Sequence, residues 1–431
     1  MRVAVVGAGP AGMAAAARLA DHGAEVSVVE AADAVGGRTR SVLLGPGHRL
    51  DTGAAWLAGF YTEALRCCRG LAMLWRDVTG TPELVVGDRR LPAPFEPAAL
   101  ARTPLLGAAE KARFARWAAG VLARRRRPHV GPPPRPDADP ADRLDADTAI
   151  RRSVGDAAAE YVLRPAFETM VFAGLDELSA AFVEGWVRAA LDGRYRVPAE
   201  GMDAPWRRIA ARLEVRCGVE VERVRVAEPG GGVVVEGVGV FDAAVVAVPA
   251  PVAARLVPSG TPGRPDWLET VRHAPHVLAY AARPHPDPPS ATDVHPAGPG
   301  RHRVGSVALM PGGDGRVPIG MQGATVSAEG WWSAELLAAG LDDRALAEAL
   351  WTEGRRLEPT LFPLRDATVL HVARHPHAVP VFGPGHLSRL AAWRPRAPVA
   401  LAGDWACYPC VEGAVRSGLR AADALLEGRS A

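Results

Sequence analysis

The sequence predicts an α/β protein whose first domain is a dinucleotide-binding domain of the Rossmann type. The first thirty residues alternate between strand-like and helix-like patterns around a glycine-rich turn. Residues 219–248 form a series of short β segments, which fits badly in a parallel sheet and predicts an accessory β-meander. The length of 431 residues exceeds the size at which one core usually stops growing, so a second domain is expected.

The N-terminal unit has the order strand, turn, helix, strand. Residues 2–6 are a short apolar run typical of a buried strand, and residues 10–22 are an alanine-rich helical stretch. Residues 24–30 form a second strand. The motif Gly7-Ala8-Gly9-Pro10-Ala11-Gly12 lies directly after the first strand and opens the helix. In that context a G-x-G-x-x-G pattern predicts nucleotide binding.

Each glycine of this motif has its own physical task. Gly7 permits the tight turn, Gly9 lets the backbone approach a pyrophosphate, and Gly12 lets the helix pack closely on the strand. Pro10 and Ala11 open the helix, whose N-terminus offers free N–H groups and a positive dipole end to phosphates.

Composition and charge exclude several classes of protein. The formal net charge is only +2, so nothing indicates nucleic-acid binding. The five cysteines have no framework spacing, which argues against a disulfide-built secreted domain. No apolar run reaches the ~18 residues that a membrane-spanning helix needs, and no signal-peptide pattern precedes Val3. We therefore expect a soluble, cytoplasmic protein without a transmembrane segment.

Arginine is nearly the only basic residue, because Lys111 is the single lysine. The four arginines at positions 124–127 leave three interpretations open: an anion-binding patch, a peripheral contact with a membrane surface, or the solvated end of a helix, and the last is favoured. The proline-rich stretch at residues 128–142 is predicted to be a loop.

The rest of the chain alternates between helical and β patterns. Residues 60–123 are mostly helical, and residues 258–318 are rich in proline and histidine with interspersed strands. Further helices are predicted at residues 156–189, 204–213, 342–357 and 412–426, and a final buried strand at residues 399–402.

A second phosphate-binding segment follows the second strand. Glu30 ends that strand, where its carboxylate can accept hydrogen bonds from both ribose hydroxyls. In Val35-Gly36-Gly37-Arg38-Thr39-Arg40-Ser41, two glycines add phosphate contacts and Arg38 suits bidentate binding of an anion. At this point the sequence resembles the flavin amine oxidase superfamily, which includes monoamine and polyamine oxidases, protoporphyrinogen oxidases and carotenoid desaturases. The resemblance implies FAD rather than NAD.

The resemblance continues in ordered motifs along the whole chain. Asp51-Thr52-Gly53-Ala54-Ala55-Trp56 is similar to the segment that passes along the flavin, and Gly201-Met202-Asp203 resembles the turn into the helix before the meander. Ala402-Gly403-Asp404, followed by residues 412–418, is similar to the C-terminal FAD signature. With the N-terminal motif, the resemblance implies FAD contacts from Gly7, Gly9, Pro10, Ala11, Gly12, Glu30, Ala31, Gly36, Gly37, Arg38, Gly53, Ala54, Ala55, Trp56, Val221, Gly403, Asp404, Val411, Gly413 and Ala414.

The fold that this resemblance implies is a Rossmann-type FAD-binding domain with a β-meander plus a mixed α+β substrate domain. We predict that residues 1–60, 200–256 and 386–431 form the FAD-binding domain. Residues 61–199 and 257–385 then form the substrate domain. Chemistry is expected where the two domains meet.

The chain departs from the family at a position that matters for chemistry. Many amine oxidases of this family carry a lysine that holds a water at flavin N5. The best local match is Ala274-Pro275-His276-Val277-Leu278-Ala279-Tyr280, which places His276 at that position, and Lys111 lies in a helical stretch. His276 is therefore a candidate to hold a water or a substrate group. A packing role is the alternative for His276 and is slightly favoured.

The aromatic cage and the covalent flavin link of some relatives are also missing. The two positions expected to sandwich an amine fall at Cys410 and near Ala378, and neither is aromatic. A cationic amine is therefore less expected as a substrate. Members with covalent flavin attach it through a cysteine near the position of His377, where this chain has none, so noncovalent FAD is predicted.

Cys407-Tyr408-Pro409-Cys410 leaves three interpretations open: a redox pair, half of a metal site, or a wall of the pocket. No second C-x-x-C and no histidine at ligand spacing accompanies it, so no metal is predicted. The favoured interpretation makes Cys410 a small wall residue beside the flavin, with Tyr408 and Trp405 as aromatic surface.

The leading hypothesis is an FAD-dependent oxidoreductase. It would carry out a two-electron oxidation (dehydrogenation or desaturation) of a small-to-medium, largely apolar organic substrate by hydride transfer to flavin N5, with O2 or another acceptor reoxidising the flavin. The catalytic candidates are His276, Tyr408, Cys410 and Trp56. The alternatives are a protoporphyrinogen-oxidase-like activity, a redox-neutral isomerase, cyclase or dehydroxylase, and a noncatalytic FAD-binding protein. The sequence predicts no oligomeric state.

Overall fold

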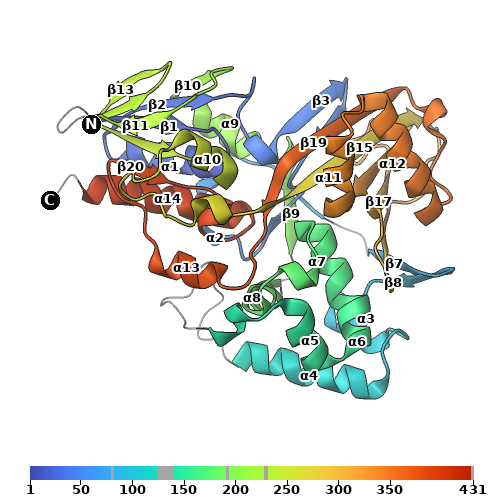
Figure 1. The fold of residues 1–431 in the computed structure, drawn as a ribbon. Coiled ribbons are helices and arrows are strands. Elements are labelled where there is room, and N and C mark those ends of the chain that lie inside the picture. Colours follow the sequence, from blue (N-terminus) through green and yellow to red (C-terminus); the bar gives the residue numbers. More distant parts are fainter. Residues whose placement is uncertain (79–81, 124–138, 191–193, 228–231, 429–431) are drawn as a thin grey trace.

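The computed structural model describes residues 1–78, 82–123, 139–190, 194–227 and 232–428. A five-stranded sheet lies at one end of the molecule and a seven-stranded sheet at the other, with a group of helices below them (Figure 1). The four arginines at positions 124–127 and most of the proline-rich loop lie outside the described residues, so the interpretations of both remain predictions.

The five-stranded sheet is the parallel sheet expected of a dinucleotide-binding domain. Every neighbouring pair in it is parallel, and β1 lies at its centre between β2 and β14. Three distant parts of the chain contribute its strands, so the sheet is complete only when the two ends of the chain meet. In spatial order the strands are β10 (Glu214–Cys217), β2 (Glu25–Glu30), β1 (Arg2–Val6), β14 (Ala243–Val246) and β20 (Val399–Leu401).

Alternate side chains of these strands enter two different cores, as the two-residue period of a strand requires. Val5 of β1 packs with helices α1 (Pro10–Asp21) and α14 (Val411–Glu427) on one face of the sheet. Val6 points to the opposite face, where the meander and helix α10 (Ala250–Leu256) cover it. Burial on both faces explains the unbroken apolar run of β1.

The first and last helices pack in direct contact. A Cβ atom on Gly418 of α14 would stand 2.0 Å from the carbonyl oxygen of Ala11 in α1, so only glycine permits this approach. Further along, Arg18 donates a hydrogen bond to Asp423 at 2.9 Å. The buried Trp206 of helix α9 (Ala204–Ala210) completes the same core.

The β-meander is shorter than the sequence predicted. It is a separate three-stranded antiparallel sheet of β11 (Val224–Val226), β12 (Val233–Val235) and β13 (Gly239–Phe241), which confirms an accessory layer. Two parts of the expectation were wrong. Residues 219–223 form no strand, and β14 pairs with β1 in the parallel sheet instead of extending the meander. The local pattern of β14 does not reveal its partner, because pairing is a tertiary choice.

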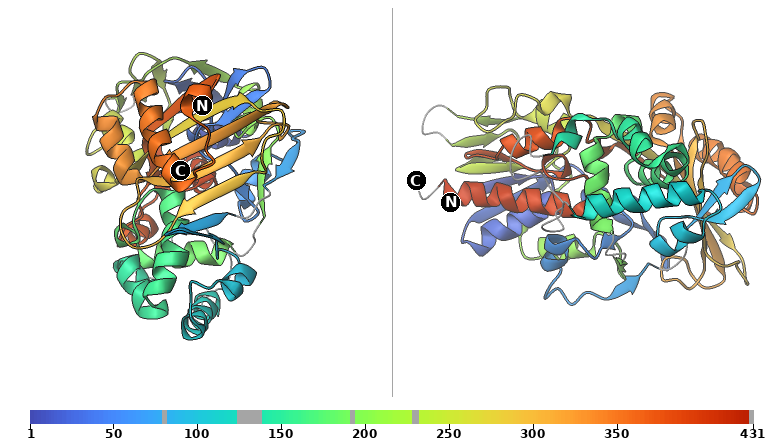
Figure 2. Two further views of the ribbon diagram at one scale, coloured as in Figure 1. Left: turned by 90° about the vertical axis from the view of Figure 1, so that its right-hand side faces the viewer. Right: turned by 90° about the horizontal axis from the view of Figure 1, so that it is seen from below.

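The seven-stranded sheet forms the other end of the molecule. Helices α11 (Gly330–Ala338) and α12 (Asp343–Leu357) cover one of its faces, as the left view of Figure 2 shows. Strand β15 pairs with β19 through a register that places His276 opposite His375. In spatial order its strands are β19 (Val369–Pro380), β15 (His273–Pro284), β18 (Met321–Ala328), β17 (Val304–Pro311), β16 (Thr292–Pro296), β7 (Glu83–Val86) and β8 (Arg89–Pro92).

Helices α3 to α8 build a third core beside the two sheets. The prediction that residues 60–123 are mostly helical was wrong in part, because β7 and β8 extend the seven-stranded sheet and β6 (Trp75–Asp77) pairs with β9 (Tyr195–Pro198). Edge pairing decides these short strands, whose own patterns are weak. The helices are α2 (Thr62–Cys67), α3 (Pro97–Arg102), α4 (Ala108–Ala123), α5 (Ala146–Val154), α6 (Asp156–Ala158), α7 (Arg164–Val171), α8 (Ala180–Ala190) and α13 (His386–Ala392), and the remaining strands are β3 (Ser41–Gly45), β4 (His48–Asp51) and β5 (Leu57–Ala58).

The fold class is confirmed, and the domain boundaries remain a prediction. All five strands of the parallel sheet fall inside the segments predicted for the FAD-binding domain, and the strands of the seven-stranded sheet fall outside them. Within the described residues, no helix has the length and apolar character that crossing a bilayer requires.

Glu412 connects α14 with the start of α2. Its carboxylate is fully buried and accepts hydrogen bonds from the backbone N–H groups of Glu63 and Ala64 and from Arg416. The first N–H groups of a helix have no partner within the helix. A side chain from the end of the chain therefore caps α2, which follows the segment carrying Trp56.

We expect Glu412→Gln to lower the free energy of unfolding by about 2–3 kcal/mol, because the amide nitrogen would face N–H donors and Arg416 would lose its counter-charge. Urea denaturation followed by tryptophan fluorescence measures the change. Glu427→Gln, on the exposed end of the same helix, is the matched control and should change stability by less than about 0.5 kcal/mol. Equal stability of the two variants would contradict the capping role.

Candidate active site

Two glycines of the turn after β1, Gly9 and Gly12, differ in how closely other protein atoms surround them. A Cβ on Gly12 would stand 1.8 Å from the carbonyl oxygen of Gly7, so Gly12 is required by the protein itself. Gly9 has an ordinary φ of −76°, and a Cβ there would meet only the Cα of Gly37, at 3.8 Å. The protein therefore does not require glycine at position 9. The bare backbone there, at the N-cap of α1, fits a ligand that approaches closely.

Glu30 is held at the edge of this turn. Its carboxylate accepts hydrogen bonds from the backbone N–H groups of Ala8 at 2.7 Å and Ala32 at 3.0 Å, and the exposed Ala31 lies between strand and loop. The Glu30 carbonyl also accepts from Val219, which brings the chain toward the buried Val221. The acidic side chain and the segment expected at the adenine thus lie at one end of the site.

The second phosphate segment lies directly against the first turn. The N–H of Gly36 donates to the carbonyl of Ala8 at 2.9 Å, and Gly37 faces Gly9. A short 3-10 helix, η1 (Gly37–Thr39), then presents Arg38. Sequence motifs separated by more than twenty residues therefore form one surface.

Arg38 forms a bidentate ion pair with Asp404. Its two terminal nitrogens stand 2.7 and 2.9 Å from the carboxylate oxygens, and one of them also donates to the carbonyl of Ala378 at 2.9 Å. Asp404 opens a short 3-10 helix, η7 (Asp404–Ala406), after β20. The pair thus connects the N-terminal motif, the C-terminal signature and the end of β19.

The segment predicted to pass along the flavin follows Arg38 in space. The N–H of Ala54 donates to the Arg38 carbonyl at 2.9 Å, and Gly53 packs on the same carbonyl. Gly53 and Ala55 are exposed, while Trp56 is half-buried. The small residues leave an open strip of backbone beside the arginine.

The start of α14 completes the arrangement. Cys410 is its N-cap, and Val411, Gly413 and Ala414 lie buried in its first turn. The N–H of Gly403 donates to the Ser417 hydroxyl at 2.8 Å, which ties the Asp404 loop to the helix. The positive end of this 17-residue helix therefore lies at the same end of the sheet as the N-terminus of α1, since α14 runs parallel to α1 from the Ala11–Gly418 contact to the Arg18–Asp423 ion pair.

Six aromatic side chains form what we call the aromatic wall. Within it, Trp56 lies with its ring centroid 4.6 Å from that of Tyr195, and Phe60 makes an edge contact with Trp186 at 5.9 Å. Trp56, Phe60 and Cys410 pack against both the core of the parallel sheet and the core of the helices. The wall therefore stands where the two cores meet. Its members are Trp56, Phe60, Tyr61, Trp186, Tyr195 and Tyr408.

Two hydroxyl groups of the wall, those of Tyr61 and Tyr408, are engaged with neighbouring groups. The Tyr408 hydroxyl donates to the Phe182 carbonyl at 3.0 Å, and burial raises the pKa of that phenol well above its ordinary value. The Tyr61 hydroxyl is bonded to the Cys410 thiol, and burial raises the pKa values of both groups. These groups therefore stay protonated at neutral pH. At Tyr61 and Tyr408 the wall therefore presents rings rather than free hydroxyl groups.

The Cys407 and Cys410 thiols are both free. Burial raises the pKa of Cys407 to about 11, so thiolate is scarce at neutral pH. Across the described part of the chain, no group of histidine, cysteine and carboxylate side chains could hold a metal ion. Both observations agree with a wall role for Cys410, which remains a prediction.

His276 lies on β15, opposite His375 of β19. Its ring stacks on Phe172 with centroids 4.0 Å apart, and burial lowers its pKa to about 3. His375 lies parallel to it at 6.5 Å and bonds to the carbonyl of Thr52, in the segment expected along the flavin. His375 therefore lies between His276 and that segment, and the catalytic role of His276 remains a prediction.

Sequence reasoning missed Phe60, Tyr61, Trp186 and Tyr195 as members of the wall. They come from separate parts of the chain, and only tertiary packing brings them together. The sequence offered one signal, since Phe60 and Tyr61 follow the flavin motif by only four and five residues.

These residues define a dinucleotide-binding protein of the FAD type, because the turns, Glu30, Arg38 and the α14 terminus suit a ligand with a nucleotide at one end and a flavin at the other. The model of the flavin containing amine oxidoreductases matches residues 10–426. The chain therefore belongs to the family of flavin containing amine oxidoreductases, as the sequence motifs predicted.

Curated relatives match only a short part of this chain. A putrescine oxidase of Kocuria rosea is 49% identical over 63 residues, which is 15% of this chain and 13% of that protein. A zeta-carotene desaturase of Synechocystis is 46% identical over 61 residues, 14% of this chain and 12% of the relative. The matched segments thus span about an eighth of each relative.

Solved structures match over nearly the whole length. Cyclohexylamine oxidase of Brevibacterium oxydans has a TM-score of 0.72 and 21% identity, and the match covers 100% of this chain and 99% of that one. At this level of identity the comparison shows the fold, which confirms the predicted class.

The contrast between Gly9 and Gly12 gives the first test of the cofactor site. We expect Gly9→Val to leave the unfolding temperature of the FAD-free protein within about 2 °C of wild type and to weaken FAD binding at least tenfold, because the new side chain fills only the space for a ligand. Fluorescence titration of the FAD-free protein with FAD measures the affinity. Gly12→Ala is the opposite control and should lose thermal stability before cofactor is added. Unchanged FAD affinity in Gly9→Val would contradict the assignment of the turn.

The neutral His276 gives a pH test. Its pKa is lowered from 6.5 to about 3 in the folded protein, so on acidification the unfolded chain takes up the proton first. Above pH 6.5 the His276 ring is neutral in both the folded and the unfolded protein and does not affect the pH dependence of stability. Between pH 6.5 and pH 3 only the unfolded chain is protonated there, so the free energy of unfolding falls by about 1.4 kcal/mol per pH unit. Phenylalanine at position 276 keeps the stack on Phe172 but does not titrate. We therefore expect the His276→Phe variant to lose about 2 kcal/mol less free energy of unfolding than the wild type when the pH is lowered to 5.

Urea unfolding at pH 8 and pH 5 measures this difference. At pH 8 the wild type and the variant both carry a neutral side chain at position 276, so the measurement at pH 8 is the internal control. A wild-type protein and a His276→Phe variant that lose equal stability between the two pH values would contradict the buried, neutral state of His276.

Proposed function

We propose that this protein is an FAD-dependent oxidoreductase that removes two electrons from a small-to-medium, largely apolar organic substrate, by dehydrogenation or desaturation. The observation that carries the proposal is the aromatic wall at the meeting of the two cores, beside the open strip at Gly53 and Ala55. When bound, FAD supplies the electron acceptor and takes a hydride equivalent at N5, and O2 or another acceptor reoxidises it.

The wall residues bind and orient the substrate. Trp56 and Phe60 offer ring faces and edges for an apolar molecule, and their packing against both cores fixes their positions. Because the hydroxyl of Tyr408 and the thiol of Cys410 are engaged within the wall, neither is free to take a substrate proton. The substrate C–H is therefore activated by its own neighbouring nitrogen or π system, and the wall excludes water around it.

A small diamine is not the substrate that this site favours. Putrescine oxidase appears among the relatives, yet the two cage positions hold Cys410 and Ala378, and the Ala378 carbonyl is occupied by Arg38. A cation before the flavin would lack an aromatic sandwich there. The proposal therefore names an uncharged or weakly basic substrate.

The FAD is proposed to be noncovalent. His377 lies on β19 next to the Arg38 ion pair, and its carbonyl accepts from Arg38 at 3.3 Å. The nearest cysteines in sequence are the buried Cys407 and the half-buried Cys410, and the raised pKa values of both thiols keep them protonated at neutral pH. Acid precipitation should therefore release FAD into the supernatant.

Anaerobic substrate addition tests the proposed reaction. The FAD-loaded protein is mixed without oxygen with a panel of apolar tertiary amines, cyclic dienes and isoprenoid alkenes. We expect at least one of these classes to bleach the flavin absorption near 450 nm persistently, because two electrons remain on the cofactor when no acceptor is present. Product formation without bleaching would support a redox-neutral reaction instead.

Phe60→Leu shows whether the wall binds the substrate that bleaches the flavin. We expect about a tenfold loss in the second-order rate of bleaching with unchanged FAD affinity, because about 1–2 kcal/mol of apolar contact is removed. Phe95→Leu, at an exposed ring outside the wall, is the matched control. Equal rates in the two variants would remove the wall from the substrate site.

A further inference from the structure

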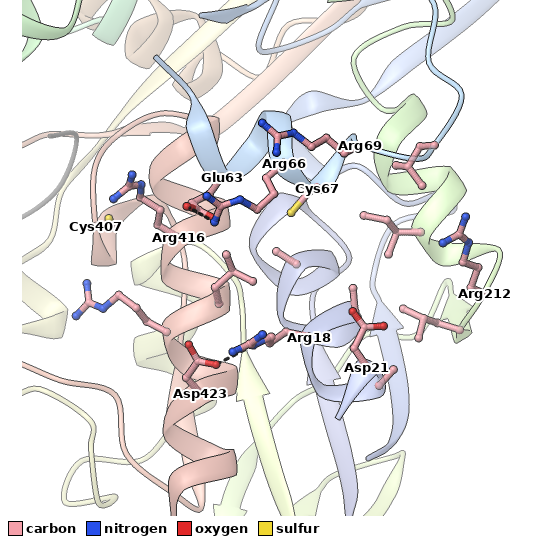
Figure 3. A pocket seen from close by; sticks show the side chains of 18 of the residues that line it. Arg18, Asp21, Glu63, Arg66, Cys67, Arg69, Arg212, Cys407, Arg416 and Asp423 are labelled. Carbon is pink, nitrogen blue, oxygen red and sulfur yellow. Dashed lines mark hydrogen bonds and ion pairs between the residues drawn. The ribbon is translucent and has the colours of Figure 1, made fainter. Parts of the chain in front are cut away.

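A second pocket lies on the flank of the parallel-sheet core, with a volume of about 920 Å³. Figure 3 shows side chains that line it, which come from α1, α2 and the turn after it, the end of α9 and the middle of α14, together with Cys407 after η7. Arg394, after α13, also lines the pocket. The floor is apolar and includes Ala17 of α1, Ile209 and Leu213 near α9, and Leu419 of α14.

Arginines dominate the rim of this pocket. Seven of its nineteen lining residues are arginine, and only three carry a carboxylate, which leaves a local excess of four positive charges. The formal charge of the whole chain is +2. The pocket is therefore more basic than the protein as a whole. The arginines are Arg18, Arg66, Arg69, Arg212, Arg394, Arg416 and Arg420, and the acids are Asp21, Glu63 and Asp423.

Ion pairs neutralise only part of this charge. Arg18 pairs with Asp423, Arg66 with Glu63, and Arg416 with the buried Glu412. The other four arginines of the rim have no carboxylate partner among the residues that the structure describes.

Two of these four are held by neutral groups. Arg394 donates to backbone carbonyls such as that of Ala391, and Arg420 is bonded to the Cys407 thiol. Arg69 and Arg212 are exposed, and the described part of the chain gives neither guanidinium a partner. Guanidinium groups in this state bind phosphate or carboxylate in bidentate fashion.

The pocket is distinct from the cofactor site. The cofactor residues of α1 and α14 lie in the first turns of these helices, between Pro10 and Gly12 and between Val411 and Ala414. The pocket begins two residues later in each helix, at Ala14 of α1 and Arg416 of α14, and continues to Asp21 and Asp423. FAD at the helix N-termini therefore leaves the pocket open.

We infer that this pocket binds an amphiphilic organic anion, with a phosphate or carboxylate head on the arginine rim, where Arg69 and Arg212 offer guanidinium groups unpaired within the described part of the chain, and an apolar body on the alanine and leucine floor. The volume falls in the range of sites that enclose a small organic molecule. The arginine rim alone would accept inorganic phosphate equally well. The apolar floor is what selects an anion with a hydrocarbon portion.

Isothermal titration calorimetry on the FAD-loaded protein tests this inference with four probes: octyl phosphate, octanoate, 1-octanol and inorganic phosphate. We expect one saturable site for each of the two amphiphilic anions. Both should bind at least tenfold more tightly than 1-octanol or inorganic phosphate, because only they use rim and floor together.

The double variant Arg69→Ala/Arg212→Ala should weaken octyl phosphate binding at least tenfold while flavin absorption and thermal stability stay unchanged, since both side chains are exposed. Arg344→Ala/Arg355→Ala removes two exposed arginines of α12 and is the charge-matched control, with unchanged affinity expected.

Three results would overturn the inference: equal binding of octyl phosphate and 1-octanol, equal affinity in the pocket variant and the control, or release of FAD by octyl phosphate. None of them depends on a known substrate for the flavin. Failure of this proposal and failure of the proposed oxidation are therefore distinguishable.

Discussion

The ion pair between Arg38 and Asp404 is the interaction on which the arrangement of the site depends. It joins residues 366 positions apart in the chain and also fixes the end of β19 through the carbonyls of His377 and Ala378. A free carboxylate beside a diphosphate site would repel the ligand, and a free arginine would collapse onto other acceptors. The bidentate ion pair holds the Arg38 and Asp404 side chains in one fixed orientation. The glycine turn, the flavin-side strip and the C-terminal signature all meet at this pair.

Much of the cofactor site was predictable from sequence, because its chemistry is local. The spacing of Gly7, Gly9 and Gly12 after an apolar run is enough to predict a strand, a turn and a helix. Residues 36–38 and Asp404 belong to short motifs with their own signatures. The structure adds a distinction that the motif does not contain: packing requires glycine at position 12, while a Cβ at position 9 would meet only the Cα of Gly37, at 3.8 Å.

The substrate side was much less predictable. The wall combines Trp56, Phe60, Trp186 and Tyr195 from segments that have no common pattern, and the short strands β6 to β8 depend on edge pairing rather than on their own residues. His276 shows the same limit in another form. The sequence match placed it at a lysine position, while the structure stacks it on Phe172. Tertiary packing decides these features, and one local stretch does not encode it.

The parallel sheet combines strands from distant parts of the sequence, and this affects how the protein folds during its synthesis. Strand β1 at the N-terminus finds its neighbour β14 only after about 240 residues and α14 only at the end of the chain. Contacts of such long sequence separation slow folding, because their loop-closure entropy must be overcome before they form. During synthesis the glycine turn therefore leaves the ribosome long before its counterparts. The nascent chain therefore lacks one part of the predicted cofactor site until α14 has been synthesised.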